Sequence, residues 1–317
     1  MKFGIRSFQE AGFDIIALQD LQTGTQVEII PAYGALLHAF KVKRGEETLN
    51  LIDSYKDLAD LEANLRSSFK SVKLSPYACR IKDAKYSWEG SDYSIQKTIA
   101  PGNAIHGLLY DAAFTVTAQE ANDQQAAITL THHFKQTDDA GYPFAYDCIA
   151  TFTLHANNEL QLSTKVVNQS NTVIPVMDGW HPYFTTGTPV DELELTFASK
   201  QIVEFNEKLL PTGNLLPYTE FVSGKLLKGV ELDNSFLLDQ EKPQPQATIH
   251  DPKKNINIAF YPGNNYPILQ IYIPPHRTSI AVENLSGAPD AFNNGIGLVQ
   301  LAAGESRVFD TRIRITL

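Results

Sequence analysis

The stretch ATFTLHANNELQLSTKVV, residues 150–167, decides the fold class. Apolar and polar side chains alternate through residues 150–155 and again through residues 160–167, and Ala156-Asn157-Asn158 separates the two runs. Alternation with a period of two is typical of a strand that buries one face, and Asn favours tight turns. A short loop can only join antiparallel neighbours. The stretch therefore predicts an antiparallel β-hairpin.

The same pattern recurs on both sides of this hairpin, with Val, Ile, Thr, Phe and Tyr enriched. Two further short loops, Ala121-Asn122-Asp123 and Asp251-Pro252-Lys253-Lys254, predict two more hairpins. With about ten strands or more expected from residue 20 onward, the sequence predicts an all-β protein, a large antiparallel β-sandwich. The other predicted strands are Gln26 to Ile30, Phe114 to Thr117, Ala127 to Phe134, Leu193 to Phe197, Ile256 to Tyr261, Leu269 to Ile273 and Val308 to Leu317.

One segment has a helical period instead. Apolar residues recur at spacings of three and four, which predicts one amphipathic helix that plugs an end of the sandwich or covers an edge. The chain has no long Gly/Ser/Pro linker and no repeat of fixed period, so we expect one domain over residues 1–317. The helical positions are Leu51, Tyr55, Leu58, Leu61, Leu65 and Phe69.

Composition and charge disfavour several classes of binding partner and location for this protein. The formal net charge of −10 disfavours binding to nucleic acid. The only cysteines, Cys79 and Cys148, lack metal-ligand spacing, so we expect buried free thiols and a reducing, cytoplasmic location. The N-terminus lacks a signal-peptide pattern, and no apolar run reaches about 18 residues, so neither secretion nor membrane insertion is expected.

Three stretches place polar side chains in unusual surroundings. Arg80 follows Ser75 to Cys79, and a guanidinium suits recognition of sugar hydroxyls, although a structural ion pair is the commoner role. His106 lies in the loop of residues 101–107, which we expect at a rim. His181 lies between Trp180 and Tyr183, which offer a stacking surface beside a proton donor.

Two carboxylates complete the candidate set. Asp233 could accept hydrogen bonds from hydroxyl groups or cap a turn. Glu283 ends an alternating strand, where a rigidly aimed carboxylate suits a general base, although an exposed glutamate is an equally good reading without context.

Several reaction classes are excluded. Adjacent His132 and His133 point to opposite faces of a strand and cannot ligate one metal. The chain has no HExxH, GxGxxG, GxxxxGK or GxSxG motif, which disfavours a metalloprotease, a Rossmann enzyme, a P-loop nucleotidase and an α/β-hydrolase. Acid/base chemistry without a metal or nucleotide remains.

From about residue 20 to the C-terminus, the chain resembles the aldose 1-epimerase (galactose mutarotase) family, which implies a β-supersandwich fold. The matching landmarks are Pro76 to Arg80, Asn103 with His106-Gly107, Gly141 to Phe144, Asn168, Gly179 to Phe184, Leu232-Asp233, Val282-Glu283 and Ala288 to Asn293.

The resemblance implies that Glu283 is the base that takes the proton of the anomeric hydroxyl, while His181 protonates the ring oxygen. It implies that Arg80, His106 and Asp233 orient the sugar, and we expect Asn103, Trp180 and Tyr183 to contact it. Ordinary pKa values of about 4 to 5 for glutamate and 6 to 7 for histidine suit these roles. The reaction requires both side chains to reach one pyranose, so a separation above about 10 Å would exclude it. No cofactor or metal is expected.

Two departures bear on the substrate: Asn284 stands where many relatives have proline, and Leu108 to Asp111 is apolar and acidic. The main prediction is a mutarotase for a free aldohexose, acting as a monomer or homodimer. One alternative is a hexose-6-phosphate mutarotase, for which Arg277 and Lys225 are the available cations, without a clear cluster. The other is a non-catalytic carbohydrate-binding protein.

Overall fold

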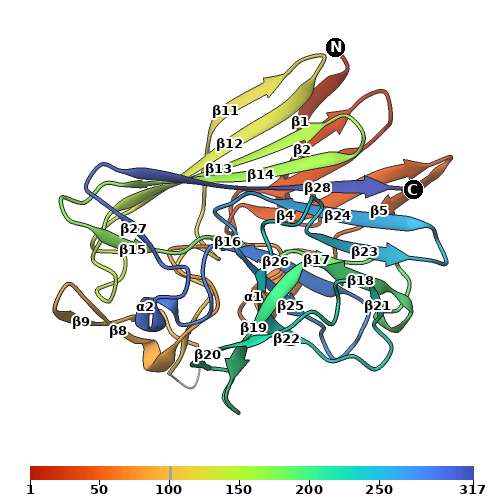
Figure 1. Ribbon diagram of the computed structural model, residues 1–317. Coiled ribbons are helices and arrows are strands. Elements are labelled where there is room, and N and C mark those ends of the chain that lie inside the picture. The colour runs from red at the N-terminus through yellow and green to blue at the C-terminus, as the bar shows by residue number, and fades with distance from the viewer. Residues whose placement is uncertain (100–101) are drawn as a thin grey trace.

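A computed structural model describes residues 1–99 and 102–317. Ala100 and Pro101 lie outside the described residues, and with them the start of the predicted loop before Asn103. Every pair of named strands in the described residues is antiparallel. The predicted all-β antiparallel sandwich is therefore confirmed (Figure 1).

A nine-stranded sheet crosses the upper part of Figure 1. It contains the predicted hairpin of residues 150–167, whose strands pair from Tyr146 with Asn168 to His155 with Glu159. The hairpins at Asn122 and Pro252 also form as predicted. In spatial order its strands are β11 (Thr115–Ala121), β12 (Gln125–Phe134), β13 (Tyr146–His155), β14 (Glu159–Asn168), β28 (Ser306–Thr316), β24 (Ile256–Pro262), β23 (Ala247–Asp251), β18 (Glu194–Phe197) and β21 (Lys225–Leu226).

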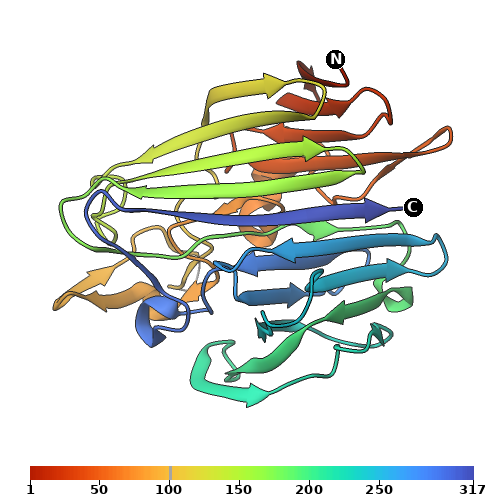
Figure 2. The ribbon, with the colours of Figure 1, turned by 45° about the horizontal axis from the view of Figure 1, so that its top comes forward.

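An eight-stranded sheet lies below it and carries most of the candidate residues (Figures 1 and 2). Aromatic rings from the two sheets meet between them: Trp180 and Phe152 have centroids 5.2 Å apart, and Phe184 and Phe260 5.0 Å. Its strands are β20 (Pro211–Pro217), β19 (Ser199–Phe205), β22 (Asp233–Leu238), β25 (Ile268–Tyr272), β26 (Ile280–Leu285), β16 (Gly179–Trp180) and β6 (Lys73–Leu74), with β17 (Tyr183–Phe184) paired to β26.

The first 50 residues form a five-stranded meander, most of which the sequence analysis missed. Residues 15–18 are four consecutive apolar residues, all buried, so this strand shows no alternation. Only the third strand of the meander had been expected. The strands are β1 (Phe3–Glu10), β2 (Phe13–Asp20), β3 (Gln26–Ile30), β4 (Leu36–Arg44) and β5 (Glu47–Asn50).

The helix is shorter than predicted. Helix α1 (Leu58–Ser68) begins after Asp57, whose side chain accepts a hydrogen bond from the Asp60 amide at 2.8 Å, as an N-cap does. Leu51 and Tyr55 are buried in extended chain instead, so the apolar spacing over residues 51–57 arises from tertiary packing. Helix α2 (Ala291–Asn294) is a single turn, and the 3₁₀ turns η1 (Lys82–Ala84) and η2 (Val190–Glu192) are equally short.

Short strand pairs close the ends of the sandwich. Strand β7 (Arg80–Ile81) pairs with β10 (Ala104–Ile105), β8 (Lys85–Trp88) with β9 (Ser91–Ser94), and β15 (Ile174–Val176) with β27 (Val299–Leu301). Both cysteines are buried free thiols, as predicted. None of the helices in the described residues is long and apolar enough to span a membrane.

Candidate active site

A pocket of about 180 Å³ lies on the eight-stranded sheet and collects six of the eight predicted site residues. The side chains that line it come from strands, from the end of α1 and from the β7–β10 pair, which are far apart in the sequence. The six predicted residues are Arg80, His106, His181, Tyr183, Asp233 and Glu283.

The floor of the pocket is a row of polar side chains across three neighbouring strands. Glu283 on β26 faces Gln270 on β25, which faces Ser235 on β22. Directly opposed residues present their side chains on one face of a sheet; Gln270 and Glu283 line the pocket, and the buried Ser235 lies beside Gln270. Gln270 Nε2 donates to Asp233 Oδ1 at 2.9 Å, and the Ser235 hydroxyl donates to Gln270 Oε1. These bonds fix the orientation of the Gln270 amide.

His181 reaches the same face from the chain after β16. The register pairs Gly179 with Leu285 and Tyr183 with Ala281, so His181 falls opposite Glu283. Tyr183, two residues on, stacks on the His181 ring with centroids 4.9 Å apart and planes inclined by 10°. This stacking restricts the rotation of the imidazole.

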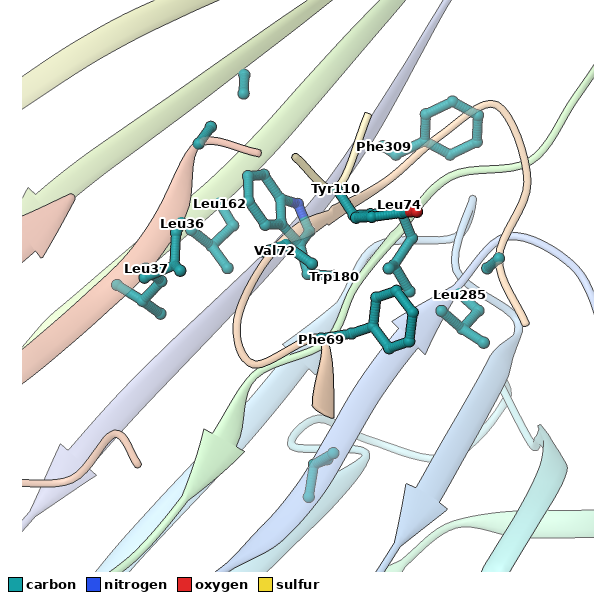
Figure 3. Packing of buried hydrophobic residues seen from close by; sticks show 14 of the residues in the cluster. Leu36, Leu37, Phe69, Val72, Leu74, Tyr110, Leu162, Trp180, Leu285 and Phe309 are labelled. Atoms are coloured by element: carbon teal, nitrogen blue, oxygen red, sulfur yellow. The ribbon is translucent and has the colours of Figure 1, made fainter. Parts of the chain in front are cut away.

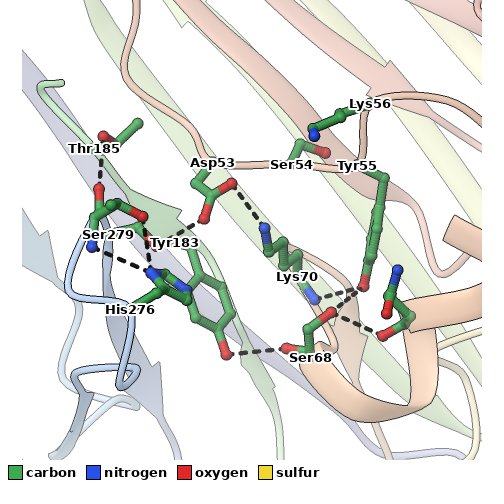
Figure 4. Close-up of polar contacts among 12 residues, drawn as sticks. Asp53, Ser54, Tyr55, Lys56, Ser68, Lys70, Tyr183, Thr185, His276 and Ser279 are labelled. Atoms are coloured by element: carbon green, nitrogen blue, oxygen red, sulfur yellow. Dashed lines mark hydrogen bonds and ion pairs between the residues drawn. The ribbon is translucent and has the colours of Figure 1, made fainter. Parts of the chain in front are cut away.

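Tyr183 is held in turn by a network of polar contacts at the end of α1 (Figure 4). Its hydroxyl donates to the Ser68 carbonyl at 3.0 Å, and the Ser68 hydroxyl contacts Tyr55 Oη at 3.0 Å. Lys70 and Asp53 form an ion pair of 2.7 Å beside them, and the Ser279 hydroxyl donates to Asp53 at 2.7 Å. The network joins the helix to Tyr183 on β17 and to Ser279, which directly precedes β26.

The β7–β10 pair brings Arg80 and His106 together. Arg80 pairs with Ile105, and the His106 amide donates to the Cys79 carbonyl at 2.9 Å. The next residue, Gly107, has a φ of 82°, and a Cβ there would lie 2.3 Å from the Ser75 carbonyl oxygen. Only glycine fits this close approach, which sets the position of His106.

The two histidines and Glu283 form one cluster. His181 Nε2 lies 3.5 Å from Glu283 Oε1, and the His106 and His181 rings meet edge to face at 4.8 Å. Within the described residues, Glu283 Oε2 and the Nδ1 atoms of both histidines are buried and have no hydrogen-bond partner. Polar atoms of this kind are available to a ligand.

Burial disfavours charge in this cluster. It lowers the pKa of His181 to about 4 and raises the pKa of Glu283 well above its usual value, with the Asp233 charge raising the latter further. The pKa of His106 is lowered by burial and by the charges of His181 and Arg80. Burial also raises the pKa of Asp233, against the effects of Arg80 and Gln270. Burial thus favours the neutral forms of both Glu283 and His181.

The cluster also resembles a metal site, because the ligand atoms of His106, His181 and Glu283 lie within 4.8 Å of one another. The Arg80 cation near His106 and the raised pKa of Glu283 both work against a bound cation. A carboxyl and an imidazole that share a proton are better suited to acid/base catalysis.

The aldose 1-epimerase family model matches residues 15–314. The chain belongs to this family. Its members are isomerases that act on carbohydrates. The fold expected from the resemblance is confirmed by the antiparallel sheets and by the likeness to solved structures of galactose mutarotase-like proteins.

The relatives agree with this assignment. The chain is 26% identical to the maltose epimerase of Levilactobacillus brevis over 267 residues, which cover 77% of this chain and 75% of that one. A galactose mutarotase-like protein from Clostridium acetobutylicum has the same fold, with a TM-score of 0.87, 19% identity and 99% of both chains covered. Galactose 1-epimerase from Lactobacillus acidophilus superposes with a TM-score of 0.81 at 17% identity, covering 100% of this chain and 99% of that one.

Three predictions about the epimerase site need correction. Trp180 is buried and points between the sheets, where it packs among Leu36, Val72 and Leu162 (Figure 3). It neighbours His181 in an extended segment, and successive side chains there point to opposite faces, so it cannot stack on a sugar in the pocket. Asn103 lines a separate groove outside the pocket. His106 is buried in the pocket wall and does not lie at an exposed rim.

Other lining residues had not been predicted. Gln270 carried a signal, because it is a polar residue between apolar neighbours in a predicted strand, and such a residue needs a buried partner. The other lining residues could not be recognised in the sequence, because their position depends on how distant segments pack. They are Ser67, Ser68, Phe69, Cys79, Ile105, Phe205, Leu209, Tyr272 and Pro289.

Proposed function

We propose that this epimerase interconverts the α and β anomers of a free aldohexose, with Glu283 and His181 as the acid/base pair. The observation that carries the proposal is the 3.5 Å separation of His181 Nε2 and Glu283 Oε1 in one buried pocket. The two oxygens that exchange protons are bonded to the same carbon of the sugar, so adjacent catalytic groups can reach both. The distance is far inside the limit of about 10 Å.

In the forward step, the Glu283 carboxylate takes the proton from the anomeric hydroxyl while the His181 imidazolium protonates the ring oxygen. The bond between the anomeric carbon and the ring oxygen breaks, which leaves an open-chain aldehyde. Rotation next to the aldehyde exposes its other face, and reversal of the two proton transfers closes the ring as the other anomer. No electrons are exchanged with a cofactor.

The pair carries one proton throughout. With the sugar ring closed the proton is on His181, and with the ring open it is on Glu283. Burial favours the second arrangement, in which both groups are neutral. Hydrogen bonds from sugar hydroxyls to the Glu283 carboxylate would favour the first. The two arrangements are thereby brought closer in free energy, as rapid proton exchange requires.

Arg80, His106 and Asp233 are placed to orient the sugar. Arg80 lines the pocket, where its guanidinium offers donors to hydroxyl groups. Asp233 keeps an oxygen free beside the one that accepts from Gln270. Phe69, whose ring lies 4.7 Å from His106, adds an apolar surface.

A free sugar is favoured over a sugar phosphate. Arg277 pairs with Asp191 at 2.8 Å and donates to the carbonyls of Val230 and Leu227, so its guanidinium is occupied. Lys225 pairs with Glu220. Neither cation lines the pocket. A non-catalytic binding protein would have no need of two histidines and a carboxylate without partners.

We also propose that residues 1–317 form one domain. A single cluster of buried side chains includes Phe3 of the first strand and Ile315 of the last. Continuous burial of this kind is the usual mark of one hydrophobic core.

Polarimetry on freshly dissolved α-D-glucose and α-D-galactose tests the proposal. We expect the wild type to hasten the approach to the anomeric equilibrium, and Glu283→Gln and His181→Asn each to lose about 10² to 10⁴ of the rate. Circular dichroism of each variant controls for folding. An unchanged rate in either variant would remove that residue from the mechanism, and no acceleration of any aldose would support the binding protein instead.

A further inference from the structure

A pair of opposite charges is buried directly behind the segment that carries His181. Lys73 Nζ lies 2.7 Å from Asp178 Oδ2, and both side chains are 0% exposed. The Lys73 ammonium also donates to the Gly179 carbonyl at 2.8 Å and lies over the Trp180 ring. Because Trp180 points between the sheets, the ion pair lies on the core side of the sheet (Figure 3). Neither charged residue lines the sugar pocket, so the pair has no direct part in the reaction.

Stability does not account for this pair. Removal of an ammonium and a carboxylate from water is costly, and an apolar pair of similar volume usually stabilises a core equally well. Tyr266 adds a third polar group, since its hydroxyl donates to Asp178 Oδ2 at 2.5 Å. Tyr266 lies two residues before β25, the strand that carries Gln270. Buried polar contacts of this kind have one preferred geometry, so they specify how the segments around them align.

Asp178 lies where the segments of the two catalytic residues meet. Its amide donates to the Ser286 hydroxyl at 2.8 Å, and its carbonyl accepts from the Ser286 amide at 2.9 Å. Asp178 is three residues before His181, and Ser286 is three residues after Glu283. The antiparallel pairing that begins at Asp178 and Ser286 therefore continues directly to the catalytic pair.

Lys73 holds the other side of the same segment. The His181 amide donates to the Val72 carbonyl at 3.3 Å, and the Ser71 amide donates to the His181 carbonyl at 2.8 Å. Strands β6 and β16 are only two residues long, so backbone pairing alone specifies their register weakly. The ion pair between Lys73 and Asp178 adds a contact that only one register can make.

We propose that Lys73 and Asp178 are positioning residues, which hold His181 in line with Glu283 from the core side of the sheet. The inference rests on the proposed function, in which these two residues exchange protons with one sugar. A displacement of about 1 Å in a catalytic group can cost about 10² in rate. Arg80 and Asp233, which are placed to orient the sugar, lie on other segments, so loss of the ion pair should affect kcat more than KM.

The test separates positioning from stability by paired substitutions. Asp178→Asn leaves the Lys73 ammonium buried without its carboxylate, so this variant should unfold at a lower urea concentration than the wild type. Lys73→Met/Asp178→Asn removes both charges at similar volume and should regain most of that loss. Glu28→Gln is the matched control, because Glu28 is buried, pairs with Lys41 at 2.5 Å and lies on β3, outside the pocket.

Initial rates are measured by polarimetry on α-D-glucose and α-D-galactose, with the spontaneous rate subtracted. We expect the double variant to lose about 10- to 100-fold in kcat, with a change in KM below about threefold and a urea midpoint near that of the wild type. Tyr266→Phe removes only the hydroxyl that bonds to Asp178 and should lower kcat about two- to fivefold, so it tests the same contact if the charge variants do not fold. Glu28→Gln should lower the midpoint and leave kcat and KM at the wild-type values.

Two results would overturn the inference while leaving the proposed function intact. In the first, the double variant or Tyr266→Phe is folded and has the wild-type kcat, so the buried contacts do not position His181. In the second, Glu28→Gln loses as much kcat as the double variant, so any destabilised variant is slow. If the wild type accelerates no aldose, the proposed function itself fails, and the inference fails with it.

Discussion

His181 Nε2 lies 3.5 Å from Glu283 Oε1 because the antiparallel register of β16 and β17 against β26 sets the two residues opposite each other. Their closeness follows from strand pairing, and it does not depend on a flexible loop. Strand pairing on both sides of His181 thus positions the pair. Its protonation, in contrast, depends on burial.

The pH dependence of kcat/KM should reveal the pKa shifts that burial causes in His181 and Glu283. The pair is active while it holds one proton. Since the pKa of His181 is about 4, a second proton binds only below that pH, and kcat/KM should fall on the acid side with a midpoint near pH 4. The alkaline limb should lie well above the ordinary pKa of a glutamate, because the pKa of Glu283 is raised. Polarimetry across pH 3 to 10, corrected for the spontaneous reaction, measures both limbs. An acid limb near the ordinary histidine pKa of about 6.5 would contradict the prediction.

Tyr183 should act through its ring more than through its hydroxyl. Tyr183→Phe loses the bond to the Ser68 carbonyl but keeps the surface stacked on His181, so we expect a loss of about 0.5–1.5 kcal/mol in the free energy of unfolding and little change in kcat. Tyr183→Ala frees the imidazole, and kcat should fall by about tenfold or more. Urea denaturation and polarimetry separate the two effects. Equal kcat values for the two variants would show that stacking is unimportant.

Gln270 should matter for substrate binding although it does not react. Gln270→Leu removes the donor to Asp233 and leaves that half-buried carboxyl without this hydrogen bond. We expect the KM to rise about tenfold, with a smaller change in kcat. Ser235→Ala, which removes only the support of the Gln270 amide, serves as a milder companion variant. If Gln270→Leu has a wild-type KM, the polar row does not orient the sugar.

Trp180 should affect stability and leave the site unchanged. Its side chain lies between the sheets near Phe152, and Lys73 Nζ lies 4.6 Å from the centre of its ring. Trp180→Phe should reduce the free energy of unfolding by about 0.5–3 kcal/mol through imperfect packing, with an unchanged KM. A raised KM at unchanged stability would restore Trp180 to the sugar-binding surface. Chemical denaturation and KM measurements on the same preparation decide between them.

The sequence by itself determined the strands in which apolar and polar side chains alternate, and the short hairpins that join them. Both depend on residues close together in the chain, and together they imply the antiparallel sandwich. It also showed the chemical types that acid/base catalysis needs, His181 and Glu283, within matching family landmarks. The fully apolar strand at residues 15–18 and the chain before α1 were misjudged, since there tertiary burial replaces local periodicity.

Only the tertiary structure decided which neighbours of His181 share its face. Tyr183, two residues after His181, shares its face, and Trp180, directly before it, does not. The tertiary structure also placed Asn103 in a separate groove outside the pocket and joined Gln270 to Asp233. It also raised the pKa of Glu283, because desolvation depends on every segment that covers a group, and those segments are distant in the chain.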